Sequence, residues 1–386
     1  MHILHISNDF GGTEVYKNLY QHLDKLGIKQ TILVPLNPRV KNRKGNHDFD
    51  FITQGSKIIY SHSQKWYHRY LYDGKIAGVV KEALKKIDFS EIDLIHSGTL
   101  CMTGAVAYEI FKKLNIPFIV SVRNTDINAY FKRMFWKRNY FNTILENASN
   151  VIFISPQYKK DCFQKYFNKS TVEVIKNKTI VIPNGINYYY LKNRKLDKKR
   201  LHNPIEIVYA AGFKNNKNLY RLIKAIELLK NKYDVKLTAV GKSLPNRKVS
   251  DKYVQLLETE AANKNYIELL EYKQKEDLCE LYKSKDIFVM PSIHETFGLS
   301  YVEALSQGLP IVYTKSQGFD GFYNEGVVGF GVDPFSIEDI ANGIESIIKD
   351  YDNLANNVVN LDLESSFDWK KIADEYVNLY KKICKI

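Results

Sequence analysis

Hydrophobic and polar positions in the first half of the chain alternate between two patterns. Short continuous apolar runs predict buried strands, and between them apolar residues recur every three or four positions, as on one face of a helix. The predicted strands are 3–6, 30–35, 94–96, 117–122 and 151–154, and the predicted helices are 14–26, 76–84, 105–114 and 140–148. This alternation indicates parallel strands joined by right-handed crossovers, which is a doubly wound α/β domain.

The second half repeats the pattern. Its predicted strands are 205–210, 235–240, 266–270, 287–290 and 311–313, and its predicted helices are 219–229, 276–282, 299–307 and 337–348. The segment 191–203 between the halves is rich in Lys, Arg and Asn, which predicts a solvated linker. We therefore expect an α/β protein of two Rossmann-like domains facing a central cleft, where such folds usually bind ligands.

Composition narrows the class of protein. With 45% apolar and 26% charged residues, the 386-residue chain is typical of a folded globular protein rather than a disordered or collagenous one. No uncharged apolar run approaches the roughly 18 residues of a spanning helix, and the first strand has no basic segment before it, so we expect no signal peptide and a cytoplasmic location. The four cysteines lie far apart, which favours reduced thiols over a metal site.

The net positive charge comes from the first half of the chain. Residues 1–200 carry 33 Lys and Arg against 16 Asp and Glu, whereas residues 201–386 carry 23 against 27. Such asymmetry indicates an anionic partner: nucleic acid, acidic lipid headgroups or a phosphorylated substrate. Segments 66–72 and 130–141 interleave aromatic and basic residues, as at a lipid headgroup interface, or as in a helix that packs its rings on the core. Because no RRM, OB or helix-turn-helix pattern is present, we expect no nucleic acid partner.

The clearest chemical signal lies in segment 291–310. A predicted buried strand ends at Met290, a polar loop carries Glu295, and a helix begins after Gly298. Free amides at that helix N-terminus suit a diphosphate. Because carboxylates repel phosphate, Glu295 and Glu303 are expected to accept hydrogen bonds from sugar hydroxyls. The alternative is a capped surface helix with incidental acidic residues.

This segment resembles the signature of the retaining glycosyltransferases of family 4, which have the GT-B fold and carry two Glu separated by seven residues. Three further stretches resemble that family in the same order: a first glycine loop (11–14), an interdomain turn (Pro183-Asn184-Gly185-Ile186) and the start of a C-terminal helix (367–369). The resemblance implies an acceptor-binding domain of residues 1–190, joined by helix 368–386, and a nucleotide-sugar-binding domain of residues 200–367.

The resemblance also implies roles on the donor side. Glu303 would bind the ribose hydroxyls of a nucleotide, and Glu295 would contact the donor sugar. The amides of Phe297, Gly298 and Leu299 would face the diphosphate and the sugar.

The leaving diphosphate is held in the family by a Gly-Arg pair followed by Lys. Here Gly212 is followed by Phe213 and Lys214, and Lys217 is expected to take the Lys role. Lys214 would replace the Arg as a point charge, but it lacks the bidentate guanidinium fork. The alternative for Lys214 and Lys217 is that both are solvated loop residues. The first glycine loop would contribute Gly12 to the donor site.

Acceptor contacts are expected at two predicted strand ends of the first domain. Many relatives carry a His after the second of these strands, where this chain has Arg123-Asn124-Thr125-Asp126. Arg123 would contact phosphate, and either Asn124 or Asp126 would contact a hydroxyl. We add Gly11, Gly12 and His96 to the acceptor set, although His96 also fits a packing role at the end of its strand. The catalytic set is then Glu295, Lys217, Arg123 and Asn124.

These expectations describe a retaining, metal-independent glycosyltransferase. It would move a hexose or N-acetylhexosamine from a nucleotide diphosphate sugar, with UDP the expected nucleotide, to a glycan or lipid-linked glycan acceptor in surface polysaccharide or lipopolysaccharide biosynthesis. No cofactor or metal is expected, because the Asp-x-Asp at 48–50 lies in a polar stretch of the first domain rather than at a strand end of the second. An anionic membrane would be a peripheral partner. The alternatives are a nucleotide-sugar epimerase or sugar phosphorylase on the same fold, and a catalytically inactive sugar-nucleotide-binding subunit.

Overall fold

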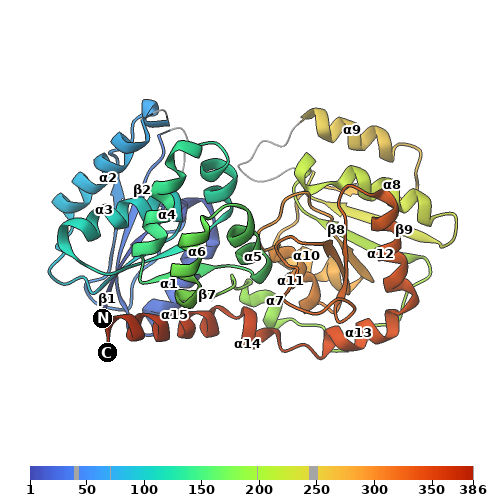
Figure 1. Ribbon diagram of the computed structural model, residues 1–386. Coiled ribbons are helices and arrows are strands. Elements are labelled where there is room, and N and C mark those ends of the chain that lie inside the picture. The colour runs from blue at the N-terminus through green and yellow to red at the C-terminus, as the bar shows by residue number, and fades with distance from the viewer. Residues whose placement is uncertain (39–42, 70, 198, 243–250, 386) are drawn as a thin grey trace. The chain divides into compact units, whose positions relative to one another are not determined.

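The computed structural model describes residues 1–38, 43–69, 71–197, 199–242 and 251–385 (Figure 1). The chain forms two compact units. The first comprises Met1–Ile154, Tyr158–Asn184 and Trp369–Ile386, and the second comprises Ser155–Gln157 and Gly185–Asp368. Each unit is a Rossmann-like α/β domain with a parallel sheet, which confirms the predicted fold class.

The first unit contains a seven-stranded sheet in the order β3-β2-β1-β4-β5-β6-β7, and every neighbouring pair is parallel. Its strands are β1 (His2–Ile6), β2 (Lys29–Pro35), β3 (Lys57–Ser61), β4 (Leu94–Ser97), β5 (Phe118–Val122), β6 (Asn150–Phe153) and β7 (Thr179–Val181). Its helices are α1 (Glu14–Lys25), α2 (Tyr72–Lys86), α3 (Ala105–Leu114), α4 (Arg138–Asn147), α5 (Pro156–Lys165), α6 (Lys169–Ile175) and α15 (Trp369–Cys384). All strands and helices predicted for residues 1–154 are present.

The second unit contains a six-stranded parallel sheet in the order β10-β9-β8-β11-β12-β13. Its strands are β8 (Ile205–Ala210), β9 (Val235–Val240), β10 (Ile267–Leu270), β11 (Ile287–Val289), β12 (Ile311–Thr314) and β13 (Gly329–Val332). Its helices are α7 (Tyr188–Lys192), α8 (Leu219–Leu229), α9 (Asp251–Ala261), α10 (Lys275–Lys283), α11 (Leu299–Ser306), α12 (Ile337–Lys349), α13 (Tyr351–Val359) and α14 (Leu363–Phe367).

The C-terminal helix α15 completes the core of the first unit. Figure 1 shows it running along the edge of this unit, with its end beside the N-terminus of the chain. Its buried face, which includes Trp369, Tyr376 and Tyr380, packs in one cluster with Leu19 of α1 and Ile3 of β1. The other face of the sheet is covered by a separate cluster that α2, α3 and α4 contribute. The sheet is therefore buried on both faces, which explains its continuous apolar strands.

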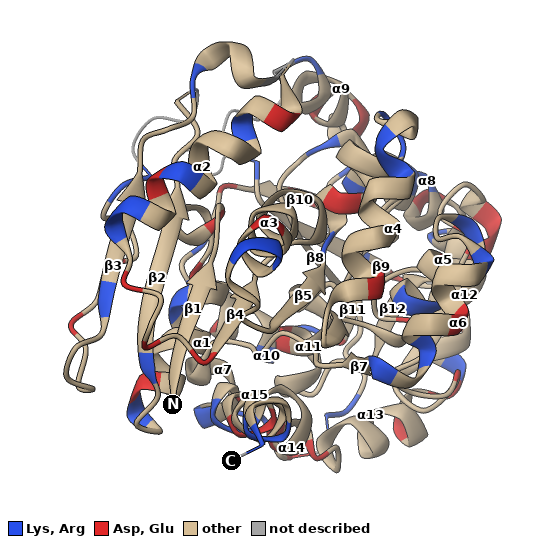
Figure 2. Cartoon of the chain, turned by 60° about the vertical axis from the view of Figure 1, so that its left-hand side comes forward, with Lys and Arg blue, Asp and Glu red and all other residues tan. Residues whose placement is uncertain are grey.

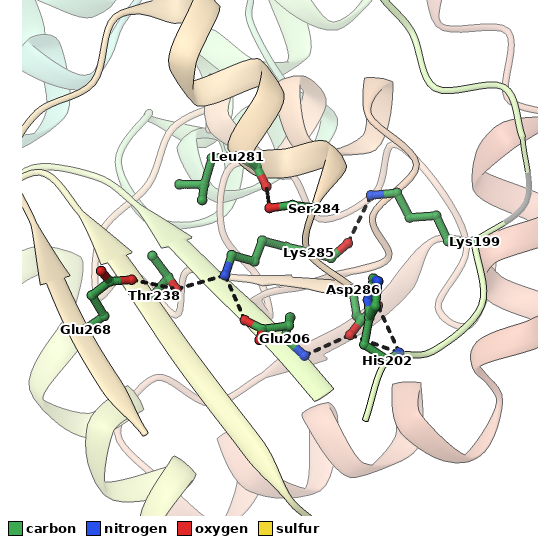
Figure 3. A network of polar contacts seen from close by, with 9 residues as sticks. All are labelled: Lys199, His202, Glu206, Thr238, Glu268, Leu281, Ser284, Lys285 and Asp286. Carbon is green, nitrogen blue, oxygen red and sulfur yellow. Dashed lines mark hydrogen bonds and ion pairs between the residues drawn. The ribbon is translucent and has the colours of Figure 1, made fainter. Parts of the chain in front are cut away.

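The predicted solvated linker is in part a buried element of the second unit, which corrects that expectation. Lys199 is buried, and its Nζ donates to the backbone oxygens of Tyr282 and Lys285, each at 2.9 Å. Burial lowers the pKa of Lys199 to about 7. Nearby, the buried Asp286 carboxylate lies 2.6 Å from Nδ1 of His202 and accepts the Glu206 amide at 2.8 Å (Figure 3). These contacts attach the segment before β8 to the sheet.

No helix in the described residues is long and apolar enough to cross a bilayer. Each of the four cysteines is a free thiol, and Cys101, Cys162 and Cys279 are buried. This agrees with the expectation that the thiols are reduced.

Candidate functional site

The predicted site residues fall into two sets, one in each unit, and each set is described by itself. In the second unit, the loop from β11 to α11 makes a sharp turn at Gly298, whose φ is +89°. A Cβ at this position would lie 2.3 Å from the Tyr301 ring, so only glycine fits. The Tyr301 hydroxyl donates to the Met290 carbonyl at 2.5 Å, which fixes that ring beneath the turn.

The turn exposes a row of backbone donors. Within the described chain, the amides of residues 297–300 donate no hydrogen bond. They comprise the first turn of α11 and the two residues before it, where unsatisfied N–H groups and the helix dipole favour an anion. The amides of Phe297, Gly298 and Leu299 are therefore available as donors, and their contact with a diphosphate stays a prediction.

Lys217 and Glu295 are paired. Lys217 ends the short 3₁₀ helix η7 (Asn215–Lys217), and its Nζ lies 2.6 Å from Oε2 of Glu295. The side-chain amide of Asn218, the next residue, donates to the carbonyls of Pro291 (2.9 Å) and Pro334 (2.6 Å). The Ile293 amide also donates to the Asn216 carbonyl at 2.9 Å. Together these bonds hold the Lys-bearing and Glu-bearing loops as one rigid piece.

A third loop, which sequence reasoning missed, supports Glu295. The Glu295 amide donates to Oε1 of Gln317 at 3.2 Å, and the Gly318 amide donates to the Glu295 carbonyl at 3.1 Å. A Cβ on Gly318 would lie 2.8 Å from the Phe297 nitrogen, so the loops touch at backbone distance. The one sequence feature that could have indicated this loop is Gly318. In a single sequence, however, such a glycine looks like an ordinary turn residue.

Phe213, at the position of the family's Arg, is a core residue. Its side chain is fully buried against the ring of Tyr209, and its amide donates to the Gly241 carbonyl at 3.0 Å. Gly241 approaches the preceding loop so closely that an added Cβ would lie 2.2 Å from the Ala211 oxygen. Gly212 and Lys214 flank Phe213, and both are half-buried. Of residues 212–214, only Lys214 has a basic side chain.

Glu303 lies on α11 and is half-buried among tyrosines. Burial raises the pKa of its carboxyl to about 7. Its charge in turn raises the pKa of Tyr190 on α7 and of Tyr282 on α10, after the larger effect of their own burial. Within the described residues the Glu303 carboxylate has no hydrogen-bond partner. A half-buried carboxylate without a protein partner is suited to accept hydrogen bonds from ligand hydroxyls.

In the first unit, Arg123 is held at the end of β5. Its Nη1 donates to Oδ1 of Asn184 at 2.8 Å, in the predicted interdomain turn, and its guanidinium lies 5.7 Å from the centre of the Tyr16 ring. The Tyr16 hydroxyl donates to the Gly98 carbonyl at 3.0 Å, and burial raises its pKa to about 12. Tyr16 and Asn184 thus orient a guanidinium whose Nε has no partner in the described part of the chain.

Asp126 has a structural role that the sequence did not indicate. The side chain is fully buried, and its carboxylate accepts hydrogen bonds from the amides of Leu100 (3.1 Å), Cys101 (2.7 Å) and Arg123 (2.7 Å). Burial raises its pKa to about 6, and the three amides act in the opposite direction. A carboxylate used in this way joins the loops after β4 and β5 and does not face solvent. Asn124 is half-buried and accepts a hydrogen bond from Asn128, so of the two alternatives for the hydroxyl contact it is the accessible one.

His96 is packed in the core beneath α15. Its Nδ1 lies 2.7 Å from the Tyr380 hydroxyl, and its ring stacks on Tyr376 at 5.2 Å. Burial, followed by the charge of Arg123, lowers its pKa to about 3. The packing alternative therefore describes its position, and the imidazole is neutral at physiological pH.

The first glycine loop lies against Arg43. Gly11 and Gly12 belong to the short helix η1 (Phe10–Gly12), and a Cβ on Gly12 would lie 2.8 Å from the Arg43 guanidinium carbon. Arg43 is also ion-paired with Asp9. Sequence reasoning missed Arg43, because it lies more than 30 residues beyond the loop that it covers.

Comparison with known proteins shows the family of the chain. The family model "Glycosyltransferase Family 4" matches residues 10–188, and the model "Glycosyl transferases group 1" matches residues 192–360. The chain is 24% identical over 324 residues to an uncharacterized glycosyltransferase of Methanocaldococcus jannaschii, covering 79% of both chains. It is 24% identical over 333 residues to alpha-monoglucosyldiacylglycerol synthase of Acholeplasma laidlawii, covering 81% of this chain and 78% of that one.

Solved structures show the same fold. Sucrose-phosphate synthase from Thermosynechococcus elongatus superposes with a TM-score of 0.73 at 21% identity, covering 99% of both chains. Anabaena HepE, crystallised with UDP, superposes with a TM-score of 0.70 at 19% identity, covering 99% of this chain and 100% of that one. Together, the two adjoining family models, the fold and the paired glutamates identify the chain as a member of the family 4 glycosyltransferases of the GT-B type.

Proposed function

We propose that this glycosyltransferase moves a hexose or N-acetylhexosamine from a UDP-sugar to a glycan or lipid-linked glycan, with retention of configuration and without a metal. The observation that carries the proposal is the Lys217–Glu295 pair, which three loops support beside the free amides of α11. Anabaena HepE, which has the same fold, has been crystallised with UDP and with UDP-glucose.

In this proposal the second unit binds the donor. The amides of residues 297–300 and the ammonium groups of Lys217 and Lys214 receive the diphosphate, and they stabilise the charge that develops on it as it leaves. These fixed positive groups act where a metal would act in other transferases. Glu303 accepts hydrogen bonds from the ribose hydroxyls. Glu295, which Lys217 positions, accepts a hydrogen bond from a hydroxyl of the donor sugar.

The first unit would bind the acceptor. Arg123 supplies a positive charge held by Asn184, and Asn124 supplies an amide for an acceptor hydroxyl. No carboxylate of the sets above is placed as a covalent nucleophile, so we expect substitution on the same face of the sugar, with the leaving diphosphate taking the proton of the acceptor hydroxyl. The positive charge of residues 1–200 supports an acceptor at an anionic membrane, and a cytoplasmic location on its inner face.

The test is a thermal-shift panel of UDP, GDP, ADP and TDP on the wild type and on Glu303→Ala. A ligand at a hundredfold excess over its Kd adds roughly 2.7 kcal/mol of stability. A shift with UDP that Glu303→Ala abolishes supports the donor site; no shift with any nucleotide overturns it. Product analysis by NMR then reports the anomeric configuration, and EDTA during turnover tests metal independence.

A second candidate is a sugar-nucleotide-binding subunit without turnover. The buried Phe213 favours it, because the family's guanidinium is absent from the diphosphate loop. Such a protein would show the UDP shift but would not release the sugar to water, transfer it to a glycan or change its configuration. Conversion of the donor without any acceptor would instead indicate an epimerase.

A further inference from the structure

A cavity of about 330 Å³ lies in the first unit, and none of the predicted site residues lines it. The short helix η2 (Trp66–Arg69) and the start of α2 form one wall, and the π-helical turn η4 (Asp126–Phe131) and the residues after it form another. Its lining residues are Asn37, Pro38, Gln64, Lys65, Trp66, His68, Tyr72, Lys75, Ala129, Tyr130, Arg133 and Met134.

The cavity is cationic. Four of its lining side chains, those of Lys65, His68, Lys75 and Arg133, carry basic nitrogens, and none of the described lining residues is acidic. Lys75 is half-buried, its Nζ donates to the Tyr130 hydroxyl at 3.2 Å, and burial lowers its pKa to about 8. A half-buried ammonium whose hydrogen-bond partner is neutral is stabilised when an anion binds beside it.

The acidic residue nearest to Lys75 in sequence is already paired with another lysine. Asp73, two residues before Lys75 on α2, has both carboxylate oxygens bonded to Nζ of Lys137, at 2.7 and 2.8 Å. Arg133 has no ion pair within the described residues. Figure 2 shows basic and acidic residues along α2, one of the elements that form the cavity. A cavity with several unneutralised donors is suited to a phosphate group, which accepts several charge-assisted hydrogen bonds at once.

Large aromatic side chains surround this cavity and face solvent. Trp66 is 67% exposed, and Phe135 and Trp136, which follow the lining residue Met134, are 68% and 62% exposed. The remaining tryptophan, Trp369, is buried. Exposed tryptophans beside basic residues are typical of surfaces at a bilayer interface, where the rings lie at headgroup depth and the cations meet phosphates.

We propose that this cavity binds the phosphate of a membrane lipid headgroup. Lys75 and Arg133 contact the phosphate oxygens, and Trp66, Phe135 and Trp136 enter the interface around it. The turn η4 connects this cavity to the predicted acceptor residues, because it begins just after Arg123 and Asn124 and ends at Tyr130 and Phe131. The inference rests on the membrane contact of the proposed function and adds to it a site and a ligand class.

The experiment measures flotation of the full-length chain with vesicles of phosphatidylcholine alone and of phosphatidylcholine with phosphatidic acid. The pocket variant is Lys75→Gln/Arg133→Gln. The matched control is Lys25→Gln/Lys57→Gln, which removes the same charge from two exposed lysines at other places on the same unit. A thermal shift with UDP is recorded for every variant, and thermal shifts with inorganic phosphate test a free ion as the source.

We expect the wild type to float with the phosphatidic acid vesicles. The pocket variant should lose roughly tenfold or more in vesicle affinity and the control no more than about threefold, with the UDP shift retained in both. Equal losses in the two variants would mean diffuse attraction and overturn the proposal, as would absence of the wild type from both vesicles. A phosphate shift that Lys75→Gln/Arg133→Gln removes, without flotation, would overturn the lipid as its source. Flotation without any UDP shift would instead contradict the proposed function.

Discussion

The ammonium of Lys217 lies 2.6 Å from Oε2 of Glu295, although 78 residues separate them in the chain. The pair joins the loop after β8 to the loop before α11, at the edge of the sheet where the free amides of α11 also lie. In the proposed function Lys217 binds the donor diphosphate and Glu295 binds the donor sugar. Binding of the two ends of the donor would then be coupled through this one contact.

Replacing Lys217 by Met should reduce turnover by about 10²–10³-fold, because it removes a fixed positive charge from the leaving group. The free energy of unfolding should change by less than about 1 kcal/mol, since both side chains of the pair are partly exposed. The exposed Lys236 on β9 provides the control, and Lys236→Met should leave turnover unchanged. Steady-state kinetics and chemical denaturation measure the two effects. Equal activity in both variants would remove Lys217 from the site.

Replacing Glu303 by Gln should separate stability from binding. Burial raises the folded-state pKa of Glu303 from 4.5 to about 7, so the folded protein prefers the neutral carboxyl. The stability of the free protein should therefore fall as the pH rises from 4.5 through about 7. Glu303→Gln lacks this loss, so its Tm relative to the wild type should rise over that range and then level off, while its UDP shift is lost. A Tm difference that stays constant from pH 5 to 8 would contradict the assignment.

Two glycines with positive φ allow two costs of an alanine substitution to be told apart: backbone strain and a clash of the added Cβ with a neighbouring side chain. Gly27 has φ +75° and open space around an added Cβ, whereas at Gly298 the Cβ would meet the Tyr301 ring. Gly27→Ala should cost about 1 kcal/mol from the backbone alone. Gly298→Ala should cost about 3 kcal/mol, because the buried ring must also move. Urea denaturation measures both, and the UDP shift should disappear in Gly298→Ala alone. An equal loss of stability in the two variants would show that the Tyr301 ring moves aside without a measurable cost.

Replacing Asp126 by Asn should destabilise the first unit rather than impair acceptor binding specifically. The amide has one oxygen in place of two and turns an N–H donor toward a backbone N–H, so at least one buried amide loses its acceptor. We expect a loss of about 2 kcal/mol or more.

The exposed Asp277 on α10 serves as the control, because Asp277→Asn should change stability by less than about 0.5 kcal/mol. If Asp126→Asn keeps wild-type stability but raises the KM for the acceptor, the carboxylate contacts substrate and its structural role is secondary.

The apolar runs predicted the positions of the strands that are buried on both faces, whereas their order in each sheet comes from the structure. The strands β3, β7 and β13 escaped prediction for local reasons. The first two are partly exposed and have only short apolar runs (58–60 and 180–182), and β13 contains two glycines. Gly329 is required there by contact, since an added Cβ would lie 1.8 Å from the Ile311 oxygen. That requirement depends on the neighbouring strand and is invisible in the sequence.

The site residues divide in the same way. Glu295, Gly298 and Glu303 belong to one strand-loop-helix segment, so their spacing already predicted a free helix N-terminus with two carboxylates. The sequence could not distinguish Asp126 from Asn124, because both follow the same strand and both are polar. Only packing shows that one is buried beneath three amides while the other remains accessible.

From the sequence alone, the periodicity of apolar residues determined two parallel-sheet domains, and one local segment indicated the donor chemistry that we propose. Both signals are local, because hydrogen bonding and helix geometry act between residues close in the chain. Tertiary structure decided which side chains meet across loops: Lys217 with Glu295, Arg123 with Asn184, and Lys199 with the carbonyls beside β11. Burial set the pKa of Glu303 and Lys75 for the same reason, since desolvation depends on every element packed around a group and not on its neighbours in sequence.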